Sequence, residues 1–311
     1  MAKKDIKILF GKSNPVLVQN ICDFLKVHPC DASISSFPDG ESSVVINTNI
    51  QDDDVFIIQS CDFPANQNYM ELFIMIDAAR RASAGRITAV LPFFGYSRQD
   101  RKDKLHVPIT AKLIANLLTT AGADRVLTLD LHSQQIAGFF DTPVEHLFAL
   151  PLFVKHLKNN TTHDLVVCAP DLGRTRMAVA YADVLHCDFG VVVKRRINGN
   201  CVKALNITGD VSGRDILLTD DMCVTFNTLD EAAKLLKRAG ARSVRAIVTH
   251  CLLTEDGYLR LQQGNVDELI TTNSTSKSHR FHNCPKITIL NIGELLGKAV
   301  LDIHNGKNVT N

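Results

Sequence analysis

One pattern recurs along this chain and limits what it can fold into. An amphipathic stretch ends at an alanine–glycine or similar sequence, and an apolar, largely β-branched run follows within a few residues, at 82–91, 121–130 and 239–249. A glycine just past a helix ends it, and continuous apolar runs suit strands that are covered on both faces. Because helices that alternate with such strands build parallel sheets, the sequence predicts an α/β fold.

The length of the chain allows two domains of this kind. With 311 residues, 45% of them hydrophobic, each half can bury a core of its own. Further apolar runs, which read as strands of the same kind, fall on both sides of the polar stretch 155–164: 55–59, 165–168 and 216–219. We therefore predict two α/β domains with parallel sheets, 1–147 and 148–311.

Charge and cysteine content exclude several classes of function. The 34 Lys and Arg residues balance the 33 Asp and Glu residues, so the net charge of +1 gives no overall field that would attract nucleic acid or an anionic membrane. The nine cysteines are scattered and never form a Cys-x-x-Cys pair, which argues against a disulfide framework or a structural zinc site. The first apolar run, 6–10, is too short for a signal peptide or a membrane span. We therefore expect a cytoplasmic protein that binds anions only locally.

Acidic residues follow three of the predicted strands. Ligand sites of open α/β sheets gather at the carboxyl ends of the strands. Polar side chains stand there in this sequence: Asp130 and His132 after one strand, Asp171 after a second, and the pair Asp220 and Asp221 after a third. Carboxylates with a single histidine suit a hard cation such as Mg²⁺ better than zinc.

The acid pair leads into a possible phosphate site. Thr228 to Glu231 has the pattern of a capping box that opens a helix at 229–238. In such a unit the free amides at the helix N-terminus meet an anion, and the acids hold sugar hydroxyls. The alternative is an ordinary strand–loop–helix joint with two solvated acids.

Three other segments are ambiguous on their own. Phe37 to Glu41 contains a Pro-Asp-Gly turn sequence. The segment 92–101 places aromatic side chains beside two arginines directly after a strand, which suits a purine with its phosphates, although isolated basic clusters are usually solvated. Lys194 to Arg196 follows an apolar run, and such a cluster is more often surface charge than catalytic.

Taken together, these segments resemble the ribose-phosphate pyrophosphokinase (phosphoribosyl pyrophosphate synthetase) family in order and spacing over nearly the whole chain. The strongest match is 130–143, Asp-Leu-His-Ser-Gln-Gln-Ile-Ala-Gly-Phe-Phe-Asp-Thr-Pro, which resembles the family's signature segment. Further matches accompany it: 37–41, 80–86, 92–101, 108–112, 194–196, 209–215 and 303–306. The resemblance implies two similar parallel-sheet domains of the phosphoribosyltransferase type, with the active site between them.

The resemblance also implies an activity and an assembly. Family members use Mg²⁺ to transfer the β,γ-diphosphoryl unit of ATP to the 1-hydroxyl of ribose 5-phosphate, giving phosphoribosyl pyrophosphate and AMP. They form dimers that assemble into hexamers, and residues of a neighbouring subunit reach the nucleotide. The segment 306–311 lacks the serine-rich, aromatic ending that often completes the family's regulatory phosphate or ADP site, which puts such control in doubt here.

By the same resemblance, individual residues receive roles. ATP would be bound by Phe37, Asp39, Glu41, Arg98, Gln99, Asp100 and Arg101. Mg²⁺ with the ATP phosphates would meet Asp130 and His132, and a second metal with the sugar would meet Asp171. Ribose 5-phosphate would be bound by Asp220, Asp221, Thr225 and Thr228. The catalytic residues would be Lys194, Arg196 and His132.

Two loops depart from the family pattern. The family's sugar-phosphate loop usually reads Asp-Asp-x-x-Asp-Thr-Gly-Gly-Thr, whereas Val224, Phe226 and Asn227 here replace an acid and two glycines. In the companion pyrophosphate loop Arg174 stands where a small residue is expected. Glycines let a backbone approach a phosphate closely and permit positive φ, so Phe226 is expected to crowd the site and to strain the turn.

These departures leave two hypotheses. In the first the chain is still a diphosphokinase, and Arg174 replaces lost backbone contacts to phosphate. In the second it is a non-catalytic or weakly active paralogue that binds nucleotide and regulates active subunits in a hetero-oligomer. Retention of Lys194, Arg196 and His132 favours the enzyme, because a subunit without activity gains nothing from cations that act in the transition state.

Overall fold

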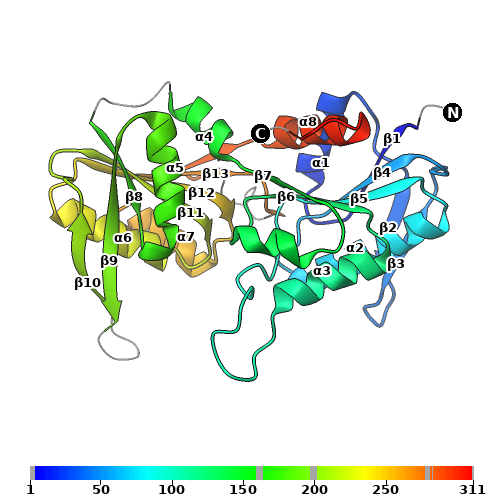
Figure 1. Ribbon diagram of the computed structural model, residues 1–311, viewed down its shortest axis with the longest axis horizontal. Coiled ribbons are helices and arrows are strands. Elements are labelled where there is room, and N and C mark those ends of the chain that lie inside the picture. Colours follow the sequence, from blue (N-terminus) through cyan, green and yellow to red (C-terminus); the bar gives the residue numbers. More distant parts are fainter. Residues whose placement is uncertain (1–3, 159–163, 197–201, 277–280, 282, 310–311) are drawn as a thin grey trace. The chain divides into compact units, whose positions relative to one another are not determined.

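The chain folds into two compact units, which are identifiable in the computed structural model (Figure 1). The structure describes residues 4–158, 164–196, 202–276, 281 and 283–309, and of 194–196 and 202–205 it describes the backbone alone. Unit 1 comprises three segments, Met1–Phe148, Ser274–Ser276 and Asn291–Asn311. Unit 2 comprises two segments, Ala149–Asn273 and Lys277–Leu290.

Unit 1 is built on a parallel sheet. Its strands lie side by side in the order β1 (Ile6–Phe10), β4 (Asp54–Ile58), β5 (Arg86–Leu91), β6 (Arg125–Leu129) and β7 (Val144–Leu147). Each strand pairs in parallel with its neighbours. The middle strands coincide with apolar runs of the sequence, because a strand covered on both faces needs apolar side chains on both. A separate antiparallel hairpin consists of β2 (Ala32–Ser36) and β3 (Ser42–Ile46).

The helices of unit 1 come from both ends of the chain. They are α1 (Pro15–Leu25), α2 (Ala65–Arg81), α3 (Thr110–Ala121), the short 3-10 helix η1 (Gln134–Phe139) and α8 (Gly293–His304). α8 packs against α1, where Gly297 leaves room for the ring of Phe24. The sequence-based division placed 291–311 in the second domain, but the structure groups this segment with unit 1, because α8 buries its apolar face there.

Unit 2 is built on a mainly parallel sheet. Its strands follow the order β10 (Val202–Thr208), β9 (Asp188–Arg196), β8 (Leu165–Ala169), β11 (Asp215–Cys223), β12 (Ser243–Cys251), β13 (Glu268–Thr272) and β14 (Ile287–Leu290). The edge strand β10 is antiparallel to β9, and the other pairings are parallel. The helices of this unit are α4 (Leu150–Leu157), the 3-10 turn η2 (Leu172–Arg174), α5 (Thr175–Leu185), α6 (Asn227–Arg238) and α7 (Glu255–Gln263).

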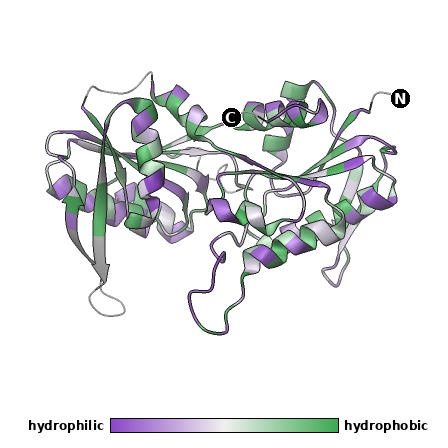
Figure 2. Ribbon diagram, in the orientation of Figure 1, coloured by the Kyte–Doolittle hydropathy of each residue, from purple (hydrophilic) through white to green (hydrophobic). Residues whose placement is uncertain are grey.

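Each unit has its own hydrophobic core. One core gathers side chains from the sheet of unit 1 and from α2 and α3, and the other gathers side chains from the sheet of unit 2 and from α6. Hydrophobic and hydrophilic positions alternate along the helices in Figure 2, as expected for helices that cover a sheet with one face. The predicted α/β fold with parallel sheets in both halves is confirmed.

The helix-to-strand joints that suggested this fold use left-handed residues. Gly122 ends α3 with φ 118°, and Gly240 follows α6 with φ 94°. At the first joint Ser83, rather than Gly85, takes the left-handed conformation, with φ 58°. Glycine is therefore the usual residue at these joints, but a serine serves the same purpose at one of them.

Candidate active site

The acid pair of unit 2 lies inside a strand, not after it. β11 continues through Asp220 and Asp221 to Cys223, and Asp220 pairs in parallel register with Val248 of β12. The two acids are buried, with 8% and 3% of their surface exposed. The prediction that the strand ends before the pair is therefore wrong, and so is the alternative of two solvated acids.

One guanidinium holds both acids. Arg174 Nε lies 2.8 Å from Oδ1 of Asp220, and Arg174 Nη2 lies 2.9 Å from Oδ1 of Asp221. Arg174 ends η2, the turn that follows β8, and β8 pairs in parallel with β11, so the carboxyl ends of the two strands meet at one edge of the sheet. The sequence suggested that Arg174 contacts a phosphate, but in the structure its guanidinium binds the carboxylates.

A third carboxylate lies close to the pair. Asp171 caps η2, since its Oδ1 accepts a hydrogen bond of 2.9 Å from the Gly173 amide. Burial, and then the charge of Asp221, raise the pKa of Asp220 well above its ordinary value, and Asp171 adds to this while Arg174 opposes it. Buried acids this close together need a positive charge beside them if both are to stay ionised.

The loop after β11 begins α6 in an unexpected way. Phe226 is the N-cap with φ 60° and ψ 3°, its side chain makes no capping hydrogen bond, and the helix starts at Asn227. The predicted capping box is therefore wrong. The acid in the first turn, Asp230, instead accepts a hydrogen bond of 2.8 Å from the backbone of Asn265.

Phe226 affects this loop through its backbone and not by blocking it. The left-handed φ confirms the predicted strain in the turn. However, the ring is only 2% exposed and belongs to the core of unit 2, so the prediction that it crowds the site is wrong. Thr225, Asn227 and Thr228 remain exposed where β11 leads into α6.

In unit 1 the candidate metal ligands stand at the end of β6. Asp130 has φ 38° and is 7% exposed, and its amide donates to the Leu147 carbonyl at 2.9 Å. His132 follows, half-buried. The next amide, that of Leu131, donates to Nε2 of His146 at 2.9 Å, which ties the segment to β7. The structure thus presents a carboxylate and an imidazole at the carboxyl edge of the sheet.

The nucleotide-binding candidates of the segment 98–101 lie against this same region. Gln135 Nε2 donates to Oδ2 of Asp100 at 3.3 Å, and the Ala111 amide donates to the Gln99 carbonyl at 3.1 Å. Arg98 and Arg101 are exposed. Gln135 was not among the predicted site residues, although its position close to His132 in the segment 130–143 is the signal that could have identified it.

The remaining nucleotide candidates form the tip of the β2–β3 hairpin. The Gly40 amide donates to the Phe37 carbonyl at 2.9 Å, and the Glu41 amide donates to Oδ1 of Asp39 at 3.1 Å. These bonds confirm the turn predicted from Pro-Asp-Gly, with Gly40 at φ 93°. The Phe37 side chain is 54% exposed, so the turn presents an aromatic ring to the surroundings of unit 1.

The candidate catalytic cations stand at the end of β9. The backbones of Lys194 and Arg196 pair with Ala204 and Val202 of β10, so both residues lie on this edge ribbon of unit 2. Their side chains fall outside the part of the chain that the structure describes, as does the predicted loop 197–200.

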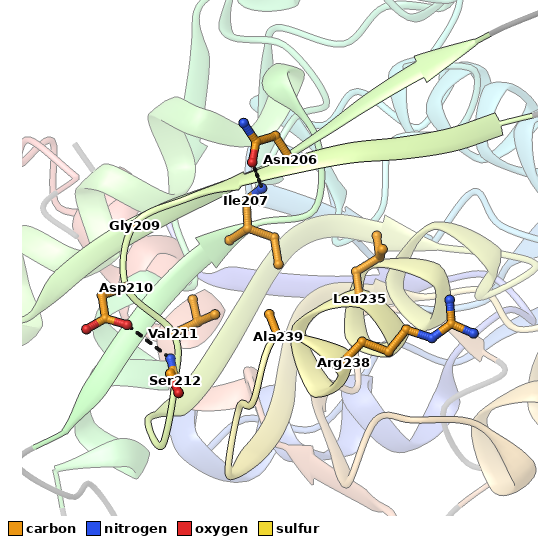
Figure 3. A pocket seen from close by; sticks show the side chains of 9 residues that line it. All are labelled: Asn206, Ile207, Gly209, Asp210, Val211, Ser212, Leu235, Arg238 and Ala239. Carbon is orange, nitrogen blue, oxygen red and sulfur yellow. Dashed lines mark hydrogen bonds between the residues drawn. The ribbon is translucent and has the colours of Figure 1, made fainter.

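Two pockets are lined by none of these residues. In unit 2 a pocket of about 510 Å³ is lined from β10 to the turn before β11 and by the end of α6, with residues such as Asp210 and Arg238 (Figure 3). It lies at the amino end of β11, whereas the acid pair lies toward the carboxyl end. In unit 1 a pocket of about 400 Å³ is lined by residues such as Asp54 and His304, at the amino ends of β4 and β5.

The described part of the chain contains no helix long and apolar enough to cross a membrane. Within the same ranges there is also no group of three or more His, Cys, Asp or Glu side chains arranged to hold a metal ion. The cysteines within the described ranges form no disulfide, and most are buried.

Comparison with known proteins gives the family. Residues 6–122 match the N-terminal domain of ribose phosphate pyrophosphokinase, and residues 191–311 match the phosphoribosyl synthetase-associated domain. The chain is 47% identical to ribose-phosphate pyrophosphokinase of Chlorobaculum tepidum over 98% of this chain and 94% of that one, and 44% identical to that of Vibrio cholerae over 98% of each.

Comparison with a solved structure indicates the same family as these sequences. The phosphoribosylpyrophosphate synthetase of Mycobacterium smegmatis superposes with a TM-score of 0.91 at 36% identity, covering 97% of this chain and 100% of that one. The residues aligned with this structure come from both units, and the sequence matches to the two relatives also span nearly the whole chain. The chain therefore belongs to the ribose-phosphate pyrophosphokinase family.

Proposed function

We propose that this chain is a ribose-phosphate diphosphokinase, an enzyme that transfers the diphosphoryl group of ATP to the 1-hydroxyl of ribose 5-phosphate. The hydroxyl oxygen bonds to the β-phosphorus, the bond from that phosphorus to the oxygen it shares with the α-phosphate breaks, and the hydroxyl proton is released. The products are phosphoribosyl pyrophosphate and AMP. The observation that carries the proposal is the connection from β11 to α6, where buried acids for sugar hydroxyls precede a helix start with no side-chain cap.

The sugar phosphate would be bound along this connection. Asp220 and Asp221 would accept hydrogen bonds from ribose hydroxyls through their carboxyl oxygens. The 5-phosphate meets the first amides of α6, where the helix dipole favours an anion, and the exposed residues Thr225 and Thr228 lie beside these amides.

ATP would be bound by residues of unit 1. Arg98 and Arg101 are exposed cations next to Gln99 and Asp100, and the hydrogen bond from Gln135 to Asp100 holds this segment against the end of β6. Cations of this kind neutralise phosphate charge, and a guanidinium can also stack on a purine.

Magnesium would accompany the nucleotide. Asp130 and His132 fit such an ion, because Mg²⁺ usually takes one or two protein ligands and fills its other positions with water and substrate phosphates. When bound, it neutralises charge on the phosphates. The chain's own part is to hold the donors, through the backbone bonds of Asp130 and Leu131 to β7.

The transferring group would be stabilised by Lys194 and Arg196, which we assign as catalytic cations, and by His132. Phosphoryl-type transfer depends on position and on charge neutralisation more than on covalent catalysis, so such cations act chiefly in the transition state.

The direct test is AMP formation by the purified chain alone, from ATP and Mg²⁺, with and without ribose 5-phosphate. We expect AMP to appear only with the sugar phosphate and to match phosphoribosyl pyrophosphate in amount. Mg-ATP should raise the melting temperature as well, since a ligand that binds only the native state stabilises it by mass action. AMP release independent of the sugar, or no reaction in the pure protein, would contradict the proposal.

Assembly into dimers and a hexamer is part of the proposal, as is a cytoplasmic location. The exposed Phe37, with Asp39 and Glu41 in the same turn, is suited to reach the nucleotide of a neighbouring subunit. Coexpression of Asp39→Ala chains with His132→Ala chains tests this. Mixed assemblies contain some sites with both residues intact, so activity should return, whereas a turn that serves its own subunit would leave the mixture inactive.

A further inference from the structure

The acid pair of unit 2 already has a cation. The Arg174 side chain is 19% exposed, and it spans two carboxylates of which 11% and 4% are exposed. One edge of its guanidinium, Nε and Nη2, forms an ion pair with one oxygen of each acid, at 2.8 and 2.9 Å. An arginine suits this position because its planar fork is always charged and binds two acceptors in fixed geometry.

We infer that Arg174 is the built-in counter-cation of Asp220 and Asp221, so that this chain binds ribose hydroxyls at the pair without a divalent metal ion there. The inference rests on the proposed function for its account of the sugar. It assigns a chemical role to the arginine, and it restricts the need for Mg²⁺ to the nucleotide.

A metal ion does not fit at the pair for two reasons. One oxygen of each acid, Oδ1, already lies against the guanidinium. A divalent ion at those oxygens would also lie within a few ångströms of a fixed positive charge, in surroundings where burial weakens screening. The nearby Asp171 already accepts a hydrogen bond from the Gly173 amide through its Oδ1.

The fold explains why the arginine reaches the pair. β8 and β11 are adjacent parallel strands, with Cys168 in register with Leu218, so the turn after β8 stands beside the last residues of β11. Asp171 fixes that turn by capping it, and the Arg174 amide donates to the Asp171 carbonyl at 3.3 Å. A small residue at position 174 would leave the acids without this charge.

The first test is metal binding without any substrate, with Mn²⁺ as the probe, counted by electron paramagnetic resonance. Arg174→Ala should bind one Mn²⁺ per chain more than the unmodified protein, because two buried carboxylates lose their cation. The matched control is Arg242→Ala. Arg242 makes a similar paired contact with Asp215 at the amino end of the same strand, and its second acid, Asp164, is exposed, so its loss should add no Mn²⁺.

The second test is stability, which also covers a variant that folds poorly. In the presence of a chelator that removes divalent ions, Arg174→Ala should melt roughly 6 °C or more below the unmodified protein. This is the size of effect expected when one partner of a buried ion pair is removed. Mg²⁺ should restore most of this loss, but it should not restore the loss in Arg242→Ala. An equal response of both variants to Mg²⁺, or no additional Mn²⁺ in Arg174→Ala, would overturn the inference.

A third measurement needs no change at Arg174. Asp221→Asn in the otherwise unmodified chain should leave the number of bound Mn²⁺ ions unchanged, whereas a metal ion held by the pair would be lost. Activity separates this inference from the proposed function. If Arg174→Ala gains Mn²⁺ but the unmodified chain never forms AMP, the proposed function is refuted and the role of Arg174 as counter-cation stands. If the chain forms AMP but Arg174→Ala gains no Mn²⁺, the proposed function stands and the role of Arg174 is refuted.

Discussion

Replacement of Phe226 by glycine tests how the loop after β11 is held. The ring is 2% exposed in the core of unit 2, and the backbone has φ 60°. Glycine would relieve the backbone, because it adopts positive φ without steric cost, but it would also remove the whole ring. The two effects oppose each other, so their sizes decide the outcome.

The loss of the ring is the larger effect. Truncation of a buried phenylalanine to alanine costs about 3–5 kcal/mol, whereas a left-handed conformation costs a residue other than glycine roughly 1–2 kcal/mol. Phe226→Ala keeps the backbone strain and loses the ring, so it should be destabilised by about 3–5 kcal/mol. Phe226→Gly also loses the ring but relieves the backbone strain, so it should be destabilised by about 2–4 kcal/mol.

Differential scanning calorimetry measures both variants. At roughly 2–4 °C per kcal/mol, Phe226→Gly should melt roughly 4–16 °C below the unmodified protein, and Phe226→Ala lower still. The exposed neighbour Asn227 serves as the control, and Asn227→Gly should cost less than about 1 kcal/mol. If Phe226→Gly is as stable as the unmodified protein, the ring does not contribute to the core and the reasoning is refuted.

Three further predictions concern other parts of the chain. Lys194→Ala and Arg196→Ala should each lower kcat about 100-fold while the Kd for ATP changes little, as measured by steady-state kinetics and equilibrium binding. Equal losses in kcat and in ATP affinity would mean that the residues only anchor the substrate. Asp54→Asn should lower the free energy of unfolding in urea by roughly 2–3 kcal/mol, since Asp54 is bound by Arg86 and His304. The backbone amides of α8 should also exchange their hydrogens faster, and unchanged hydrogen exchange would mean that this contact does not hold α8. Burial raises the pKa of Cys22 to about 11 and that of Cys168 to about 12, so above about pH 8.5 the unfolded chain loses protons that the native chain keeps. Stability should therefore fall as the pH rises from there toward about 12, and Cys168→Ala should weaken this dependence; a flat urea midpoint would contradict it.

The sequence by itself determined much of the fold, and it predicts which residues form the site. Apolar runs between helix ends predict parallel strands, because a strand buried on both faces must be apolar throughout. Polar residues at the ends of those strands, such as Asp130 and His132, then predict a ligand site at that edge of the sheet, since carboxyl ends of parallel strands meet there. These inferences depend on local spacing alone, and spacing can be read along the chain.

The tertiary structure decided what the unusual residues do. The order of strands places β8 beside β11, and only that adjacency brings the guanidinium of Arg174 to Asp220 and Asp221. Likewise, the left-handed backbone of Phe226 turns its ring into the core, where residue type alone suggested an obstruction. A long side chain can reach several partners, and its choice depends on which charges and cavities the packed strands bring within a few ångströms. That information exists only once the chain has folded.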